Sequence, residues 1–337
     1  MSGPPPRVAV IGAGAWGTTL ADLLARKPLP VTIWAREPEV VDAINRDHVN
    51  GLFLPNAPLA PGLVATGSLT EAVRNADVVV CAAPSHAMRA VMTEAAAGTR
   101  GTPLVVNVSK GLEPERQERL STVLLEVFGQ GTPVAVLSGP SFAQEVYQRQ
   151  PTAVVAAASD HEVACRVQEV FSTQSFRVYS HTDVIGVELG GALKNVIALA
   201  AGILEGLGLG FNPRAALLTR GLAELTRLGV ALGADPLTFA GLAGLGDLVL
   251  TATGSLSRNR SLGVELGQGK GLAEILATRR TVAEGVNTAQ TAVALAERHG
   301  VELPIARQVS DILFHGKAPR QAIADLMERA PKPEQWR

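Results

Sequence analysis

The sequence has little cysteine, few aromatic residues and almost no net charge. Its 337 residues include two cysteines, 4% aromatic residues and a formal net charge of −1. Cys81 and Cys165 lie far apart and form no C-x-x-C pair, which argues against a zinc site or a disulfide framework and for a reducing compartment. The near-neutral balance argues against nucleic acid as the main partner, because such binding usually requires a basic face.

The sequence also lacks metal-ligand spacing, a signal peptide and an uninterrupted apolar run. The histidines are scattered, at His48, His86, His161, His181, His299 and His315. The first residues, MSGPPP, contain no apolar segment of the kind that directs secretion. The most apolar run, 196–211, is interrupted by Glu205 and four glycines, so we expect no membrane-spanning helix. These absences predict a cytoplasmic protein without a metal site.

Length and composition predict two folded domains. Hydrophobic residues make up 47% of the chain and charged residues 18%, which is enough for a sizeable core. Strand-like segments stop near residue 182, and Ala/Leu/Gly-rich helical segments follow. We therefore expect an α/β domain over residues 1–185 and an all-α domain over residues 186–337.

A glycine motif follows the first predicted strand. The apolar segment 7–11 precedes Gly12, Gly14 and Gly17, in G-x-G-x-x-G spacing, and a helical segment follows. The first glycine permits a tight turn, the second lets a pyrophosphate approach the backbone, and the third lets the helix pack on the strand. The phosphates would lie at the helix N-terminus, which favours an anion. This context predicts dinucleotide binding rather than a purely structural turn.

The end of the second predicted strand bears on cofactor preference. The strand 31–34 is followed by Ala35, Arg36 and Glu37. An acid near this position binds the ribose 2′-OH of NAD, whereas an arginine suits the 2′-phosphate of NADP. Arg36 is therefore compatible with NADP and with the use of both cofactors, since it could bind the 2′-phosphate or stack on the adenine, and a solvated loop arginine is the alternative.

The remaining segments predict a doubly wound parallel sheet followed by helices. Further strands are expected at 77–81, 104–108, 132–137, 151–158 and 176–179, the last two as antiparallel additions. Helix-like segments such as 85–97 and 113–128 alternate with them, which is the βαβ pattern. Later helices are expected at 182–209, 213–232, 236–252, 260–277, 285–299, 304–315 and 319–329. Polar or glycine-rich segments follow several strands, and ligands of open α/β sheets bind at that carboxyl edge.

One lysine stands in an unusually apolar segment. Lys194 is the only Lys or Arg between Arg177 and Arg214. Such a cation either extends to water or is held for a purpose, and the residues leave both open. Gly190 and Gly191 cost about 1 kcal/mol each relative to alanine inside a helix. A neighbouring helix or a ligand is therefore expected to approach there.

Two polar segments lie between the later predicted helices. The first is Gly244-Leu-Gly-Asp247. The second, Ser257-Arg258-Asn259-Arg260, combines a helix N-terminus with a hydroxyl, an amide and a guanidinium, which are the components of a phosphate site. An ordinary N-cap followed by a charged first turn is the alternative, and these residues by themselves slightly favour it.

The motifs together resemble the bacterial NAD(P)-dependent glycerol-3-phosphate dehydrogenases. The segments that carry the resemblance are GAGAWGTTLA, VSKGL, LSGPSFAQEV, VELGGALKNVIALAAGI, GLAGLGDLVLT and SRNRSLG, in this order over nearly the whole chain. The resemblance implies a Rossmann domain followed by an all-α domain of the 6-phosphogluconate dehydrogenase C-terminal-like type. It also implies a homodimer that interconverts dihydroxyacetone phosphate and sn-glycerol 3-phosphate with NADP or NAD, without a metal, for phospholipid synthesis.

The resemblance also implies a role for individual residues. Lys194 matches the catalytic lysine, which also contacts the substrate. The other positions that match substrate contacts are Lys110, Gly139, Ser141, Asp247, Ser257, Arg258 and Asn259. The positions that match cofactor contacts are Gly12, Gly14, Ala15, Trp16, Gly17, Arg36, Lys110, Ala143, Arg258, Val282 and Glu284. Position 15 is often serine in the family, but a backbone contact there would survive as alanine.

The implied chemistry suits these residue types. Reduction of a ketone by hydride leaves an alkoxide, and a desolvated lysine whose pKa is lowered toward neutrality can protonate it. Asp247 would orient Lys194 or bind hydroxyls, and Arg258 would hold the phosphate. A ketopantoate reductase of the same two-domain build and a nucleotide-binding sensor without turnover are the alternatives. The Ser-Arg-Asn segment argues against the first and Lys194 against the second.

Overall fold

The N-terminal part of the chain forms an eight-stranded sheet covered by helices. The computed structural model describes residues 4–279, 283–331 and 333–334. The strands are β1 (Val8–Ile11), β2 (Val31–Trp34), β5 (Leu63–Thr66), β6 (Val78–Cys81), β7 (Leu104–Asn107), β10 (Val134–Ser138), β11 (Thr152–Ala157) and β12 (Phe176–His181). Their order across the sheet is β12-β11-β10-β7-β6-β1-β2-β5.

The strand directions confirm the doubly wound prediction. The six strands from β10 to β5 run parallel, and β1, β6 and β7 are buried along their full length. Burial on both faces is why these strands consist of continuous apolar runs. β11 runs antiparallel to β10 and β12 runs parallel to β11, so both oppose the main sheet, as expected.

Helices connect and cover the strands of this domain. They are α1 (Ala15–Ala25), α2 (Pro38–Asp47), α3 (Leu69–Val73), η1 (Ser85–Ala87), α4 (Met88–Gly98), α5 (Leu120–Phe128), α6 (Ala143–Tyr147) and α7 (His161–Phe171). A small hairpin of β3 (Val49–Asn50) and β4 (Leu54–Pro58) lies beside them.

One prediction for this domain was wrong, and one strand of the sheet was not predicted. The segment 113–128 is not one helix, because β8 (Leu112–Glu113) and β9 (Glu118–Arg119) pair as a hairpin before α5 begins. Arg89 of α4 holds this hairpin through hydrogen bonds to Glu113 and Glu118, at 2.5 and 3.0 Å. The edge strand β5 was also not predicted, since four residues after a loop carry little periodic signal and depend on pairing with β2.

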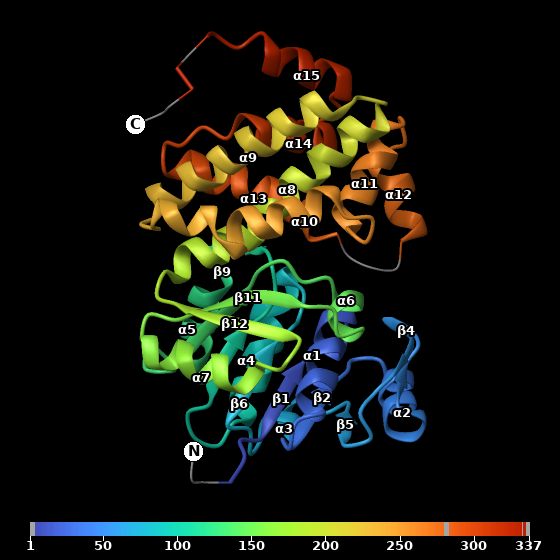
Figure 1. Ribbon diagram of the computed structural model, residues 1–337, viewed down its shortest axis with the longest axis vertical. Coiled ribbons are helices and arrows are strands. Elements are labelled where there is room, and N and C mark those ends of the chain that lie inside the picture. Colours follow the sequence, from blue (N-terminus) through green and yellow to red (C-terminus); the bar gives the residue numbers. More distant parts are fainter. Residues whose placement is uncertain (1–3, 280–282, 332, 335–337) are drawn as a thin grey trace.

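The C-terminal part is helical and lies on top of the sheet domain (Figure 1). Its helices are α8 (Val184–Gly206), α9 (Phe211–Ala231), η2 (Pro236–Ala240), the π-helical η3 (Leu242–Gly246), α10 (Asp247–Thr253), α11 (Arg258–Gly267), α12 (Leu272–Thr278), α13 (Glu284–Arg298), α14 (Pro304–Phe314) and α15 (Pro319–Met327). The expected segments 236–252 and 260–277 are thus each divided. Gly241, which separates η2 from η3, and the glycines of η3 interrupt the first, and Gly269, with a φ of 95°, follows the end of α11.

Helix α8 is the centre of the helical domain. It packs against α9, α10, α11, α13 and α14 (Figure 1). It is long and apolar enough to cross a bilayer, with a mean hydropathy of 1.6, but 89% of its most apolar window is buried inside the protein. Burial of this extent is what the core helix of a globular domain shows, and it explains why so few polar residues occur along it.

Candidate active site

The glycine turn after β1 fits a dinucleotide. Gly12 has a φ of 119°, and a Cβ on it would lie 2.8 Å from the Ala82 carbonyl oxygen. A Cβ on Gly17 would collide with the backbone of Gly12, whereas one on Gly14 would meet no protein atom within 4 Å. Packing within the chain therefore demands glycine at the first and third positions only. The open second position, which is also the N-cap of α1, leaves the backbone accessible to a pyrophosphate.

Other predicted cofactor residues lie near this turn. Ala15 and Trp16 begin α1, and the Nε1 of Trp16 is buried without a hydrogen-bond partner among the described residues. The carbonyl of Ala143, at the start of α6, accepts a hydrogen bond from Thr19 of α1 at 3.2 Å. This contact brings the segment after β10 beside the first helix. Val282 lies outside the described residues.

Arg36 follows β2 at the same edge of the sheet. Its side chain is 82% exposed, and its guanidinium donates to the Glu37 carboxylate at 2.8 Å. The exposure agrees with the alternative of a solvated loop arginine. It equally leaves the guanidinium accessible to a charged group on a ligand.

A cluster of charged side chains lies where the sheet domain meets α8 and α10. Lys194 is 5% exposed and Asp247 is fully buried. The Nζ of Lys194 donates to Asp247 Oδ1 at 2.5 Å and to Thr251 Oγ1 at 2.6 Å. Lys110, from the loop after β7, donates to Asp247 Oδ2 at 2.7 Å. Lys194 therefore does not extend to water, and two ammonium groups share one carboxylate.

Burial dominates the electrostatics of this cluster. The pKa of Lys194 is lowered to about 7, chiefly by desolvation and to a smaller extent by the charge of Lys110, and the attraction of Asp247 opposes both effects. A lysine with a pKa near neutrality can both give and take a proton at physiological pH. The cluster thus has the property that acid–base chemistry requires.

The turn after β10 completes the sheet side of the cluster. Gly139 has a φ of 138°, and a Cβ on it would lie 2.9 Å from the Cα of Val154. Its carbonyl accepts hydrogen bonds from Lys110 at 2.8 Å and from the Ser141 hydroxyl at 2.9 Å. Ser141 Oγ also accepts from Lys110 at 3.4 Å. The strained glycine turn therefore places a hydroxyl beside an ammonium group.

The start of α11 supports both interpretations of the Ser-Arg-Asn segment. Ser257 is an ordinary N-cap, because its Oγ accepts from the Arg260 backbone N–H at 3.2 Å. Asn259 donates to Asn195 Oδ1 at 2.9 Å and accepts from the Gly285 N–H at 3.0 Å. The side chains of Ser257 and Asn259 are thus already engaged within the protein.

Arg258 differs from both of its neighbours. Its side chain is exposed, and its guanidinium has no hydrogen-bond or ion-pair partner among the described residues. Surrounding protein lowers the pKa of the Arg258 guanidinium by desolvation, and Glu284 opposes this shift. An accessible, partly enclosed arginine without a partner is suited to bind an anion.

Glu284, at the start of α13, bridges the two domains. Its Oε1 accepts from the Ser85 N–H at 3.1 Å and its Oε2 from the Ser85 hydroxyl at 2.5 Å. Ser85 lies in the segment after β6, beside Gly111. The carboxylate is therefore held at the carboxyl edge of the sheet by donors of the N-terminal domain.

Sequence reasoning missed three residues of this region: Thr251, Asn195 and Ser85. Thr251 lies one helical turn after Asp247, so the i, i+4 spacing could have identified it as a second hydrogen-bond acceptor for Lys194. Asn195 follows Lys194 directly and donates to the carbonyl of Lys110 at 3.2 Å. Ser85 had no local signal, because its partner is 199 residues away.

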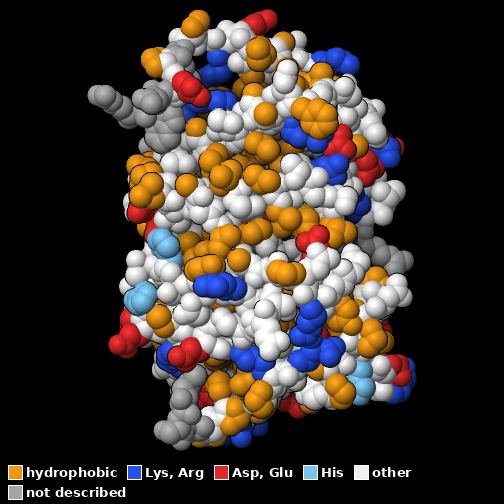
Figure 2. All heavy atoms as spheres, viewed as in Figure 1, with side chains coloured by type: hydrophobic (Ala, Val, Ile, Leu, Met, Phe, Trp, Pro, Cys, Tyr) orange, Lys and Arg blue, Asp and Glu red, His pale blue; other side chains and the backbone are white. Residues whose placement is uncertain are grey.

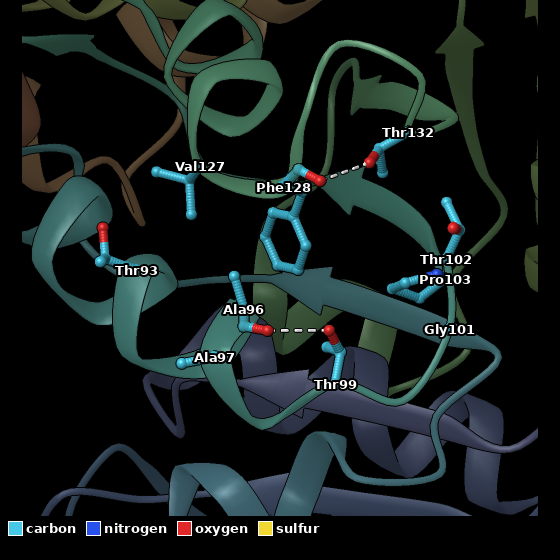
Figure 3. A pocket seen from close by; sticks show the side chains of 10 residues that line it. All are labelled: Thr93, Ala96, Ala97, Thr99, Gly101, Thr102, Pro103, Val127, Phe128 and Thr132. Carbon is cyan, nitrogen blue, oxygen red and sulfur yellow. Dashed lines mark hydrogen bonds between the residues drawn. The ribbon is translucent and has the colours of Figure 1, made fainter.

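A separate hollow of about 350 Å³ lies at the opposite edge of the sheet (Figure 3). It is formed by the ends of α4 and α5 and the segments before β7 and β10, and no titratable side chain lines it. The hydroxyls of Thr99 and Thr132 donate to backbone carbonyls (Figure 3). The hollow therefore cannot supply acid–base chemistry. Within the described ranges, no group of three or more His, Cys, Asp or Glu could hold a metal.

Comparison with known proteins agrees with the arrangement of the two domains. The family models for the N-terminus and the C-terminus of NAD-dependent glycerol-3-phosphate dehydrogenase match residues 7–164 and 183–324. A Geobacter sulfurreducens protein named glycerol-3-phosphate dehydrogenase (NAD(P)+) is 56% identical over 332 residues, 98% of this chain and 99% of that protein.

Solved structures give the same result. The crystal structure of glycerol-3-phosphate dehydrogenase from Coxiella burnetii superimposes with a TM-score of 0.93 at 40% identity, covering 96% of this chain and 99% of that one. A ketopantoate reductase family structure from Ralstonia eutropha covers 94% of this chain and 99% of that one, with a TM-score of 0.60 at 16% identity. This second similarity shows a common fold alone.

Proposed function

Since the chain belongs to the NAD-dependent glycerol-3-phosphate dehydrogenase family, we propose that it reversibly reduces dihydroxyacetone phosphate to sn-glycerol 3-phosphate with NADPH or NADH. The observation that carries the proposal is the buried cluster of Lys194, Asp247 and Lys110 at the carboxyl edge of the sheet. The glycine turn that fits a dinucleotide lies at the same edge. The product would supply glycerophospholipid synthesis.

Lys194 is the general acid of the reduction and the general base of the reverse reaction. When bound, the nicotinamide cofactor supplies the hydride. The Nζ of Lys194 protonates the substrate oxygen as it becomes an alkoxide, and a pKa of about 7 suits transfer in either direction. Asp247 and Thr251 hold the Nζ at 2.5 and 2.6 Å, so the acid is already positioned before reaction.

Lys110 contributes charge to the same site. Its ammonium group lies 2.7 Å from Asp247 Oδ2 and 2.8 Å from the Gly139 carbonyl oxygen, which fixes it beside the reacting oxygen. A fixed positive charge in a water-poor site stabilises a developing alkoxide and keeps the pKa of Lys194 low. Ser141 and Gly139 would contact the substrate hydroxyl from the same turn.

Arg258 binds the substrate phosphate. Its guanidinium offers a planar fork that matches a phosphate, and it has no partner among the described residues. Ser257 and Asn259 act indirectly, since the first caps α11 and the second ties it to α8. Binding energy from the phosphate end then positions the carbonyl at Lys194.

The glycine turn and its neighbours hold the cofactor. Gly12, Gly14 and Gly17 shape the pyrophosphate site, with Ala15 and Trp16 in the first turn of α1. Arg36 would bind the 2′-phosphate of NADP. Contacts from Ala143, Lys110, Arg258, Glu284 and Val282 are proposed from the resemblance.

The larger organisation is proposed on simpler grounds. We divide the chain into residues 1–185 and 186–337, a boundary that lies in the first turn of α8 (Val184–Gly206), shortly after β12 ends at His181. We place the enzyme in the cytoplasm, without a membrane span or a nucleic-acid partner, since α8 is buried and the net charge is −1.

A homodimer is the proposed assembly. Most large hydrophobic side chains that stay exposed among the described residues belong to the helical domain, among them Phe211, Leu237 and Met327. Figure 2 shows hydrophobic atoms gathered over that domain. Light scattering coupled to size-exclusion chromatography should give twice the mass of one chain, and the mass of a single chain would reject the dimer.

Cofactor oxidation with a panel of ketones tests the function. We expect the purified chain to oxidise both NADPH and NADH with dihydroxyacetone phosphate and neither with ketopantoate. Activity on ketopantoate alone would support the related reductase. Absence of oxidation with every ketone, despite NADPH binding, would support a sensor.

A further inference from the structure

Helices α8 and α11 contact each other backbone to backbone. A Cβ on Gly202 of α8 would lie closer than 3.0 Å to the carbonyl oxygen of Arg260. A Cβ on Gly206 would lie closer than 3.0 Å to the carbonyl oxygen of Val264. Real Cβ atoms essentially never approach so closely. A hydrogen is thus the only substituent that fits on this side of the contact.

The second helix has the same requirement. A Cβ on Gly263 of α11 would collide with the carbonyl oxygen of Leu199, and one on Gly267 would collide with that of Ile203. The obstacles are backbone atoms, which cannot rotate aside as a side chain can. The two backbones are therefore in direct contact, and any side chain at these glycines would force the helices apart.

A buried hydrogen bond fixes the register of the same pair. Asn259 of α11 donates to Asn195 of α8 at 2.9 Å, across 64 residues of sequence. Gly263 meets Leu199 and Gly267 meets Ile203 with the same offset. The helices therefore run in the same direction, in constant register, from this bond to the end of α11.

A third link fixes the first turn of α11. Arg260 donates from Nε and Nη2 to the two oxygens of Glu205, at 3.0 and 2.6 Å. Arg214 of α9 donates to the same carboxylate at 3.2 Å. Glu205, the charge that interrupts the apolar run of α8, is therefore the anchor of the neighbouring helix.

We propose that the glycine contact makes α8 and α11 a rigid spacer that sets the separation between Lys194 and Arg258 and thereby selects the substrate by length. The inference rests on the proposed roles of these two residues. Lys194 immediately precedes Asn195, and Arg258 immediately precedes Asn259. Because these two amides are hydrogen-bonded to each other, the spacing of the helices directly sets the positions of Lys194 and Arg258. The preferred class is a phosphorylated hydroxyketone with one methylene between its carbonyl carbon and its ester oxygen.

Gly202→Ala tests the spacer, and Gly221→Ala is its matched control. Gly221 lies on α9, and the three atoms nearest to a Cβ there all belong to the side chain of Ile197 on α8, so the variant crowds a side chain of the same helix but no backbone atom among those three. Gly202→Ala should lower kcat/KM for dihydroxyacetone phosphate by about 100-fold, the scale of a misplacement near 1 Å. Gly202→Ala should change kcat/KM for unphosphorylated dihydroxyacetone far less. Gly221→Ala should change kcat/KM for the phosphorylated and the unphosphorylated ketone by the same factor.

A longer substrate provides a test in the unaltered enzyme. The homologue with one extra methylene between carbonyl and phosphate ester should be reduced about 100-fold less efficiently than dihydroxyacetone phosphate. Gly202→Ala should narrow this ratio. If that variant does not fold, Gly206→Ala, one turn farther along α8, should narrow it by a smaller amount.

Equal efficiency of the wild-type enzyme on both phosphorylated ketones would overturn the spacer, as would an equal loss on phosphorylated and unphosphorylated ketones in Gly202→Ala. Arg258→Ala separates this result from failure of the proposed function. If Arg258→Ala lowers kcat/KM for the phosphorylated ketone alone and Gly202→Ala lowers it for both ketones equally, only the spacer is wrong. If Arg258→Ala affects both ketones equally, the phosphate site itself is wrong.

Discussion

The two sides of the site differ in how far their functional groups are exposed to solvent. On the sheet side, glycines expose backbone to a ligand, and the one arginine that follows β2 is 82% exposed. On the helical side, Lys194 and Asp247 are buried and bonded to each other. Charges interact weakly in water and strongly in a desolvated interior. We therefore expect substitutions on the helical side to have the larger effects.

The largest effect is expected from Lys194→Met. The variant keeps much of the side-chain volume and should fold and bind NADPH, because the glycine turn is in the other domain. Its kcat should fall by about 10² or more, since a general acid is lost. Steady-state rates measure kcat, and a fluorescence titration with NADPH measures cofactor binding. The exposed Lys270→Met serves as the control, and a Lys194 variant with a tenth of wild-type activity would reject the assignment.

Arg258→Ala should have the next largest effect. Although part of the Arg258 side chain is exposed, surrounding protein desolvates its guanidinium, so loss of a charge-assisted contact to phosphate should cost about 2–4 kcal/mol in kcat/KM for dihydroxyacetone phosphate. The cost should be much smaller with unphosphorylated dihydroxyacetone. Added phosphite should partly restore the reduction of this small ketone in wild type but not in the variant. Equal losses on both ketones would direct the search for the phosphate site to Lys110 and Ser141.

The pH profile should report the buried lysine. Protonated Lys194 is needed for reduction, so kcat/KM should be level below pH 7 and fall about tenfold per unit above the pKa of about 7. The oxidation rate should show the opposite trend. Because the charge of Lys110 lowers this pKa, Lys110→Met should move the inflection to higher pH. An inflection that stays in place or moves to lower pH would contradict the coupling.

The smallest effect is expected on the sheet side, from Arg36→Asp. Repulsion of the 2′-phosphate should lower the ratio of kcat/KM for NADP to that for NAD by about tenfold or less, since exposed charges interact weakly. Arg46→Asp is a matched control, because Arg46 is also exposed and also paired with the following acid. An unchanged ratio in Arg36→Asp would leave Arg36 as a solvated loop residue.

The features that depend on local chemistry could be predicted from the amino-acid sequence. Apolar β-branched runs predicted the buried strands β1, β6 and β7, and the spacing of Gly12, Gly14 and Gly17 predicted the first turn. The change to Ala/Leu-rich segments predicted a helical second part. These signals lie within a few residues of what they specify. For the same reason, the weak four-residue strand β5 and the hairpin before α5 were missed.

The contacts among the charged groups depend on packing between segments that are far apart in the sequence. The residues left Lys194 either functional or extended to water, and its burial with Asp247 depends on contacts across 53 residues. Lys110 reaches the same carboxylate across 137 residues. Only once α11 lies on α8 does the Ser-Arg-Asn segment divide into a helix cap, a guanidinium that has no partner among the described residues, and an amide bonded to α8. A pKa near 7 is likewise a property of the packed interior, because desolvation requires the whole fold.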